Sequence, residues 1–82
     1  MERKDILEKF KDNAPIYAVV DEVNISEIRE YATPTLEFDR KTMDIFYSLP
    51  IRDSIDDDIV DILLEEGWCL GENNNLILYL KF

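Results

Sequence analysis

The side chains in this sequence that are best suited to chemistry are carboxylates at helical spacing. The four residues are Asp57, Asp58, Asp61 and Glu65, and Asp61 stands three or four positions from each of the others. An α-helix would place them on one face, with Cβ atoms about 6 Å apart at that spacing. Carboxylates at this distance can share a divalent cation or attract a cationic partner. The chain contains no histidine, so it cannot form the Ser-His or Cys-His pair of a nucleophilic enzyme. Metal binding and charge-based recognition are therefore the roles to weigh for these residues.

A metal site at these carboxylates is the first interpretation to test. Segment 57–61 has the sequence DDIVD, which matches DDxxD and resembles the Mg²⁺-diphosphate motif of terpenoid synthases. Those enzymes need a large helical enclosure, which 82 residues cannot build. The span 53–66 also lacks the central glycine and the alternating ligands of an EF-hand loop. We therefore expect no metal site and no cofactor, and interpret the carboxylates as a charged helix face.

Three other groups could act in catalysis, and each has a structural explanation. Cys69 lies among apolar residues, where a thiol is usually a small core side chain. Glu37 and Asp44 form a carboxylate pair of a kind that is common on surface hairpins, with no sign of a cleft that excludes water. The stretch 71–75 has one glycine, no lysine and Glu72, whose charge would repel a phosphate. We therefore expect that the protein is not an enzyme.

The elements expected to position these residues begin with a helix that buries Ile6, Leu7 and Phe10. Residues 16–20, IYAVV, form an apolar run rich in β-branched and aromatic side chains, which favours a strand buried on both faces. Residues 16–23 also fit a helical stripe, so strand and helix are both open there.

A short helix is expected next, over residues 25–31. Asn24 is a good N-cap, and Glu27 stands three positions later, where it would complete a capping box. Pro34 ends this element, because proline cannot continue a helix.

The clearest β pattern is the alternation of apolar and polar residues over 35–48, around Arg40 and Lys41. With that pair as the turn, Phe38 would face Met43 across the hairpin. One face would then be wholly apolar: Leu36, Phe38, Met43, Ile45 and Tyr47. The other face would carry Phe46 among three carboxylates, which are Glu37, Asp39 and Asp44. The pair lacks the Asn-Gly or Asp-Gly of a two-residue turn, so the loop length stays open.

The acidic helix is expected over residues 55–66. Ser54 resembles the start of a capping box, three aspartates follow in the first turn, where the helix dipole favours negative charge, and Gly67 is the natural C′ residue. The expected core stripe of this helix is Ile55, Ile59, Ile62 and Leu63, widened by Val60 and Leu64.

A hairpin around 71–75 should close the chain. The residues of its last strand that share one face are Leu76, Leu78, Leu80 and Phe82, with Ile77 and Tyr79 on the other face. Because both faces of this strand are largely apolar, we expect it to be central in the sheet.

The expected fold class is α+β, with a single small domain over residues 1–82. The element order is α-β-α-β-β-α-β-β, and we expect a mostly antiparallel sheet with the helices packed on one face. The middle of this order resembles the ferredoxin-like split βαβ arrangement, as an analogy of element order.

The net charge of −10 is located in one part of the sequence. Residues 21–66 contain 14 acidic and 4 basic residues, while the first helix is neutral. Nucleic-acid and anionic-membrane binders need clustered Lys and Arg, so we expect neither nucleic acid nor a membrane as partner. One cysteine, no apolar run of about 20 residues and an acidic N-terminus predict a cytoplasmic protein.

The charge distribution therefore predicts a protein that binds a basic protein partner. Asp57, Asp58, Asp61 and Glu65 would face its Lys and Arg side chains, with Glu37, Asp39, Asp44 and Phe46 as a second patch. By size and charge, the chain resembles phage-encoded inhibitors that mimic DNA and immunity proteins that neutralise nuclease toxins, a likeness that transfers no residue. The expected function is that of an inhibitor or regulator. The alternative is a structural protein that forms a homo-oligomer through strand edges and apolar surface, and a solubilising role explains the acidic face equally well.

Overall fold

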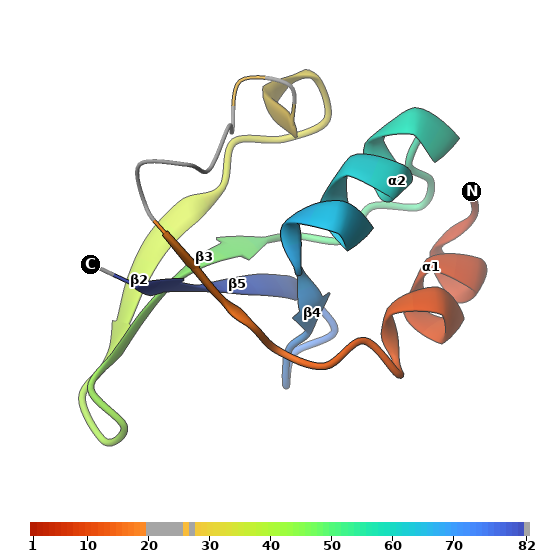
Figure 1. The fold of residues 1–82 in the computed structure, drawn as a ribbon. Coiled ribbons are helices and arrows are strands. Elements are labelled where there is room, and N and C mark those ends of the chain that lie inside the picture. The colour runs from red at the N-terminus through yellow and green to blue at the C-terminus, as the bar shows by residue number, and fades with distance from the viewer. Residues whose placement is uncertain (20–25, 27, 82) are drawn as a thin grey trace.

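The computed structural model describes residues 1–19, 26 and 28–81, and its elements follow the expected order (Figure 1). The α+β class is confirmed. The elements are α1 (Arg3–Phe10), β1 (Tyr17–Val19), the 3₁₀-helix η2 (Ile28–Glu30), β2 (Thr35–Asp39), β3 (Asp44–Leu49), α2 (Asp57–Glu66), β4 (Cys69–Leu70) and β5 (Leu76–Lys81).

One mixed sheet joins the five strands in the order β1-β5-β3-β2, with β4 also paired to β5. As expected, β5 is central: β3 pairs with one of its edges, and β4 and β1 follow each other along the opposite edge. The β1–β5 pair is parallel and the other pairs are antiparallel. The sheet is therefore mostly antiparallel, as the sequence predicted.

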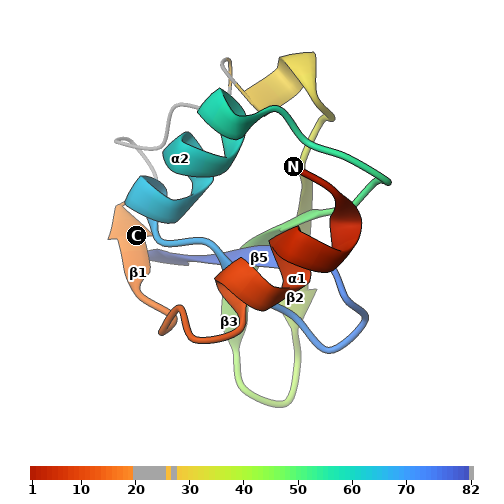
Figure 2. The ribbon, with the colours of Figure 1, turned by 90° about the vertical axis from the view of Figure 1, so that its right-hand side faces the viewer.

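Both helices pack on the same face of this sheet (Figure 2). Alternate residues of β5 point into the core between helices and sheet, and Leu76 and Leu78 have no exposed surface. Buried side chains of the helices meet them there: Ile6, Phe10, Ile59, Val60 and Leu63. Cys69 is also buried, as expected, and its thiol lies 3.7 Å from the Ile77 carbonyl oxygen. No helix of the described residues covers the opposite face of the sheet, which we call the open sheet face.

Helix α2 begins two residues later than expected, at Asp57. Ser54 does not cap it, because the backbone of Ser54 forms an isolated bridge with Glu2 and the Ile55 amide donates to the Met1 carbonyl oxygen. Those contacts hold the backbone extended up to Asp56. Ile55 is still buried, at 2% exposure, so its place in the core is confirmed although it lies outside the helix.

The end of α2 is as the sequence predicted. Gly67 adopts a left-handed conformation with φ of 95°, and its amide and that of Trp68 donate to carbonyl oxygens of the last helical turn. This geometry is the usual glycine C-terminal cap. It turns the chain directly into β4, which brings Trp68 into the core with no exposed surface.

Strand β1 confirms the strand interpretation of residues 16–20, but the expected burial on both faces is wrong. Tyr17 is 54% exposed and Val19 is also exposed, while Ala18 packs against the core. The reason is position: β1 is an outer strand of the sheet, and one of its faces belongs to the open sheet face. Residue 20 and the rest of the helical stripe considered for 16–23 lie outside the described residues.

Within the expected helix over residues 25–31, the described residues form the 3₁₀ turn Ile28–Glu30. The Tyr31 and Ala32 amides both donate to the Ile28 carbonyl oxygen, and β2 begins soon after, at Thr35. Beyond Glu30, the short distance to β2 and the proline before it leave no room for another helical turn. Residues 24, 25 and 27, which include the expected cap and capping box, lie outside the described residues, as does residue 82 of the last strand.

The β2–β3 hairpin has a four-residue turn instead of the two-residue turn considered above. Asp39 pairs with Asp44 as the last pair, and Phe38 faces Ile45 instead of Met43. Met43 lies in the turn with φ of 64°, and the Asp39 carboxylate accepts a hydrogen bond from the Lys41 amide, which stabilises the longer turn. The expected place of Met43 in the second strand is therefore wrong. Because the pairing shifts by two residues, an even number, the side chains within β2 and β3 keep their expected faces.

Candidate functional site

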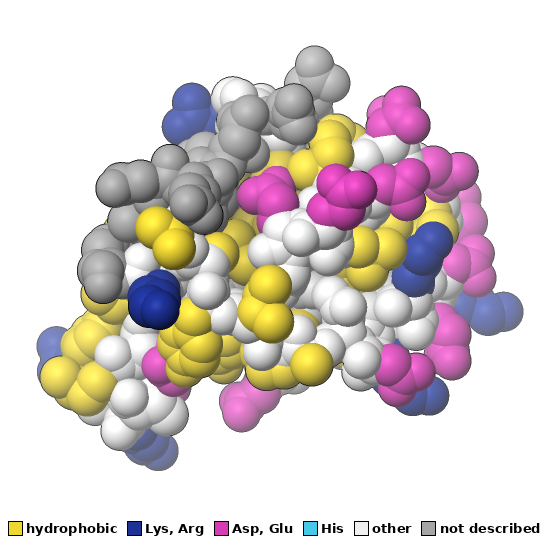
Figure 3. Space-filling model, in the orientation of Figure 1, with side chains coloured by type: hydrophobic (Ala, Val, Ile, Leu, Met, Phe, Trp, Pro, Cys, Tyr) yellow, Lys and Arg dark blue, Asp and Glu magenta, His cyan; other side chains and the backbone are white. Residues whose placement is uncertain are grey.

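The structure separates the expected site residues into two surfaces. We call Asp57, Asp58, Asp61 and Glu65 the helix carboxylates. All four are exposed, and they lie on the side of α2 opposite the buried Ile59, Val60 and Leu63. Figure 3 shows acidic side chains gathered over the helices, at the upper right of the molecule. The expected arc is therefore present on the outside of the helical layer.

One helix carboxylate has a cationic neighbour. The Met1 amino group lies 3.4 Å from Asp57 Oδ1 and also donates to the Ile55 carbonyl oxygen. The Asp57 side chain is 80% exposed, and ion pairs this exposed contribute little to stability. The helix carboxylates thus present their charge to solvent.

The second set of expected residues lies on the open sheet face. Glu37 pairs with Phe46, Phe46 with Tyr79, and Tyr79 with Tyr17, so the four side chains form one row across β2, β3, β5 and β1. The ring centroids of Tyr17 and Tyr79 are 5.3 Å apart, and those of Phe46 and Tyr79 are 5.8 Å apart. These are distances at which aromatic rings attract one another. The open sheet face therefore has an aromatic row that ends at a carboxylate.

Hydrogen bonding fixes the phenol at one end of this row. The Tyr17 hydroxyl donates to Asp44 Oδ1 over 2.8 Å, which joins β1 to β3 across the intervening β5. That hydrogen bond to an anionic acceptor is the main reason that the pKa of Tyr17 is raised above its usual value. The Tyr17 hydroxyl therefore remains protonated at neutral pH and orients the Asp44 carboxylate.

Tyr79, at the centre of the row, is in a negative field. Its partial burial comes first among the causes that raise its pKa, followed by the nearby Cys69 and by the carboxylates Asp44, Asp39 and Glu72. The burial that comes first opposes a charge of either sign, whereas the three carboxylates oppose only a negative one. The carboxylates are the part of this setting that would attract a positively charged side chain.

A cavity of about 230 Å³ lies beside Tyr79 on the open sheet face. It is bounded by the β2–β3 hairpin and the turn between β4 and β5. Its walls combine two aromatic rings with three carboxylates: Phe46, Tyr79, Glu37, Asp39 and Glu72. An Arg or Lys head can contact an aromatic face and a carboxylate together, and such contacts strengthen each other where water is excluded. This cavity is the candidate site.

Basic residues also stand near the candidate site. Arg40 and Lys41, in the hairpin turn, line a neighbouring hollow together with Phe38. That hollow shares Phe46 and three carboxylates with the candidate site: Glu37, Asp39 and Glu72. The two basic residues therefore partly offset the negative charge on the hairpin side of the candidate site.

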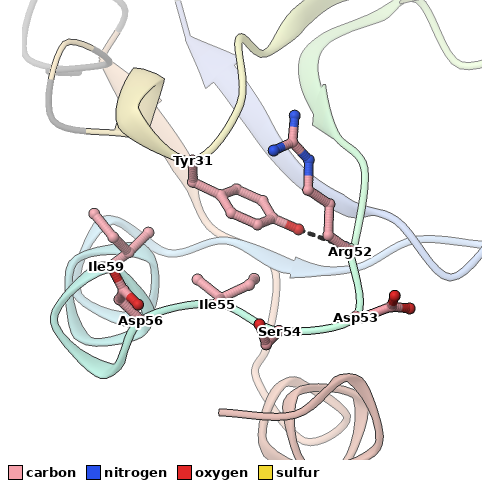
Figure 4. A pocket seen from close by; sticks show the side chains of 7 residues that line it. All are labelled: Tyr31, Arg52, Asp53, Ser54, Ile55, Asp56 and Ile59. Carbon is pink, nitrogen blue, oxygen red and sulfur yellow. Dashed lines mark hydrogen bonds between the residues drawn. The ribbon is translucent and has the colours of Figure 1, made fainter.

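A second cavity, of about 350 Å³, lies between η2 and the start of α2 (Figure 4). The Tyr31 hydroxyl accepts a hydrogen bond from the Arg52 amide and donates to the Pro50 carbonyl oxygen, and the Arg52 guanidinium lies 5.2 Å from the centre of the Tyr31 ring. Burial raises the pKa of Tyr31, although its contacts with Arg52 oppose that shift. Tyr31 therefore connects the segment after β3 to the end of η2. We assign a structural role to the residues around this cavity.

The two carboxylates that line this cavity lie apart. Figure 4 shows the side chains of Asp53 and Asp56 at opposite ends of the Ser54–Ile55 segment. Within residues 1–19, 26 and 28–81, no group of three Cys, Asp or Glu side chains is placed to hold a metal ion. In the same part of the chain, no helix is long and apolar enough to cross a membrane.

Sequence reasoning found the carboxylates and Phe46 but missed Tyr17, Tyr79 and Glu72. The alternation in the last strand predicts that Tyr79 lies on the face opposite Leu76 and Leu78, and the structure confirms it. The sequence does not show which strands lie beside Tyr79. The structure also shows that the two acidic sets lie on opposite sides of the molecule, because the helices cover one face of the sheet and the candidate site is on the other. They cannot contact one flat partner surface together.

Comparisons of the chain with protein-family models, with curated proteins and with solved structures give no match.

Proposed function

We propose that this protein is a non-enzymatic binding module that docks its open sheet face on a basic protein and thereby inhibits or regulates that partner. The observation that supports this function is the candidate site, where Glu37, Asp39 and Glu72 surround the rings of Phe46 and Tyr79. Proteins that process nucleic acid carry exposed Lys and Arg for phosphate, so they are the class of partner we expect.

The candidate site would supply the short-range contacts. An inserted Arg side chain would lie over Tyr79 or Phe46 with a carboxylate at its edge, a combination that is worth more than either contact alone where solvent is excluded. The half-buried rings lose little side-chain freedom on binding, because Tyr17 and Phe46 already hold Tyr79 in place. A few such anchors usually provide most of the affinity of an interface.

The helix carboxylates would act at longer range. They face away from the docked surface, yet their charge adds to the field that attracts a cationic partner and so raises the association rate. Their effect should fall with added salt, since the Debye length shrinks from about 10 Å at 0.1 M to about 3 Å at 1 M.

The test compares three variants that change the net charge by the same amount at different places. Glu37→Lys alters the candidate site, Asp61→Lys alters the helix carboxylates, and Asp12→Lys alters the exposed turn after α1. The partner is first captured from native lysate at low and high salt, and its association and dissociation rates are then measured with each variant.

We expect Glu37→Lys to weaken binding at least about tenfold, mainly through faster dissociation. Asp61→Lys should slow association by a small factor, and this effect should disappear near 1 M NaCl. Asp12→Lys should slow association by the same factor or by a smaller one. Unchanged dissociation in Glu37→Lys would contradict docking by the open sheet face. Faster dissociation in Asp61→Lys would place the contact on α2.

One observation favours the alternative function, a homo-oligomer. Leu36, Phe38 and Met43 of the β2–β3 hairpin are exposed although they are large and apolar. Light scattering near 1 M NaCl separates the two functions, because apolar self-association strengthens with salt while charge-based docking weakens. We expect a monomer under these conditions, and a stable oligomer would support the alternative.

A further inference from the structure

Strand β2 is an outer strand with an unpaired edge. In the sheet formed by the described residues it has one neighbour, β3, to which it pairs over its whole length from Thr35 to Asp39. Its other edge presents backbone N–H and C=O groups that a further strand could pair with. Proteins commonly protect such edges with charged side chains, above all lysine, with a proline or with a bulge. The sequence of β2, TLEFD, has no lysine and no proline, and its pairing with β3 is continuous. Its charged side chains are two carboxylates, which repel an acidic strand and attract a basic one.

The two faces of β2 differ in chemistry. Leu36 and Phe38 lie on the face toward the helices, yet they are 57% and 51% exposed and stand outside the core cluster, because the helices do not extend over this strand. Glu37 and Asp39 lie on the other face, beside the candidate site. A strand placed along β2 would therefore meet apolar side chains on one face and carboxylates on the other.

We propose that β2 accepts an extended segment of the basic partner as an added strand, in which Lys or Arg residues alternate with apolar residues. The proposal rests on the proposed function and specifies how the partner would be recognised. Side chains of a strand alternate between faces, so one register places every basic residue toward Glu37 and the candidate site and every apolar residue toward Leu36 and Phe38. Backbone pairing would provide affinity, and the alternation would provide specificity.

Charge opposes a second copy of the chain in the antiparallel register that pairs the whole of β2, and also in the register centred on Phe38. Antiparallel pairing of two β2 strands about Glu37 would place Glu37 opposite its own copy, with Thr35 opposite Asp39. Pairing about Phe38 would place Glu37 opposite Asp39. Like charges directly across a pair of strands are destabilising, and no basic residue lies within β2 to relieve them. A basic strand would instead place Lys or Arg side chains beside Glu37 and Asp39. Charge complementarity therefore favours a basic partner at this edge.

The experiment uses two synthetic peptides of the same composition. One alternates, Lys-Val-Arg-Val-Lys-Val-Arg, and the other has its charges in a block, Lys-Arg-Lys-Arg-Val-Val-Val. Each is titrated into the ¹⁵N-labelled full chain and followed by amide chemical shifts and by cross-strand nuclear Overhauser effects. We expect the alternating peptide to bind about tenfold more tightly, with its strongest contacts to the backbone of Thr35–Asp39.

Paired variants identify the contribution of each face of β2. Leu36→Thr with Phe38→Thr removes the exposed apolar surface while keeping residues that favour strands, and should abolish the advantage of the alternating peptide. Glu37→Lys should weaken both peptides. Asp12→Lys changes the net charge equally, away from the strand, and should leave the ratio of the two affinities unchanged.

Equal affinities for the two peptides, with shifts confined to residues around Phe46 and Tyr79, would overturn strand addition and leave charge-based docking standing. Binding of the alternating peptide at another strand edge would also overturn it. If neither peptide shifts any amide at millimolar concentration, strand addition is wrong, and the proposed function is then decided by the rates measured with the intact partner.

Discussion

The helix carboxylates and the open sheet face carry the same kind of charge in different surroundings. On α2 the carboxylates are exposed to solvent, and the opposite side of the helix packs in the core. On the sheet, the carboxylates of Glu37 and Asp39 lie beside aromatic rings and share a cavity with them. A partner's cation would keep most of its water at α2 and would lose much of it at the sheet. The same residue type therefore favours long-range attraction in one region and specific contact in the other.

The largest effect should come from the buried side of α2. Leu63→Ala removes a side chain with no exposed surface from the core and should lower the free energy of unfolding by about 2–5 kcal/mol, as read from urea denaturation. Asp61→Asn, on the exposed side of the same helix, is the control and should change it by less than about 0.5 kcal/mol. Similar losses in both variants would mean that the outer face of α2 also holds the fold together.

The next largest effect should be on binding by the sheet. Tyr79→Leu keeps an apolar side chain but removes the ring at the centre of the aromatic row, so the dissociation constant of the basic partner should rise about five- to thirtyfold, the range of a cation–π contact. Tyr79→Phe retains the ring and is the matched control. If both variants bind like the parent protein, the aromatic row is not part of the interface.

A smaller effect concerns the link between β1 and β3. Asp44→Asn replaces the charged acceptor of the Tyr17 hydroxyl, so the pKa of Tyr17 should fall toward its ordinary value near 10. The phenolate absorbance during an alkaline titration measures this, with Tyr17→Phe to assign the transition. Because the folded state raises this pKa, the hydrogen bond stabilises the protein below pH 10 and is lost as the pH rises through the pKa of the folded state. An unchanged titration would show that Tyr17 and Asp44 do not interact in solution.

The smallest effect should be at the helix carboxylates. Asp61 is four residues from both Asp57 and Glu65, and like charges at that spacing cost a helix a few tenths of a kcal/mol per pair. Asp61→Lys should therefore raise the melting temperature slightly at low salt, and the gain should vanish at high salt. A loss of stability would show that the carboxylate makes a contact within the fold, which would remove the distinction between the two regions.

Local patterns were sufficient for much of this fold. The alternation in β5 and the glycine after α2 each depend on neighbouring residues, and both predictions are confirmed. The turn between β2 and β3 was harder, because Asp39 stabilises a longer loop through its own side chain. The prediction that Ser54 caps α2 is wrong, because a bridge to the distant residue Glu2 holds the Ser54 backbone extended. Such contacts between remote parts of the chain have no local signature.

In the candidate site, too, some features follow from local sequence and others depend on distant contacts. Glu37, Asp39, Asp44 and Phe46 alternate with apolar residues, so their common face was predicted from the sequence and is confirmed. Their binding role stays a prediction. Tyr17 could not be added to them, because its place depends on the pairing of β1 with β5, which joins residues near opposite ends of the sequence.

That pairing has a consequence for how the protein is made. Bringing Tyr17 beside Tyr79 closes a loop that includes most of the chain, and contacts of this kind slow folding because the entropy of the loop is lost before the contact forms. During synthesis, β1 leaves the ribosome long before β5, so the aromatic row is absent from every shorter nascent chain. A partner that contacts this row would therefore bind only after β5 has paired with β1 and β3.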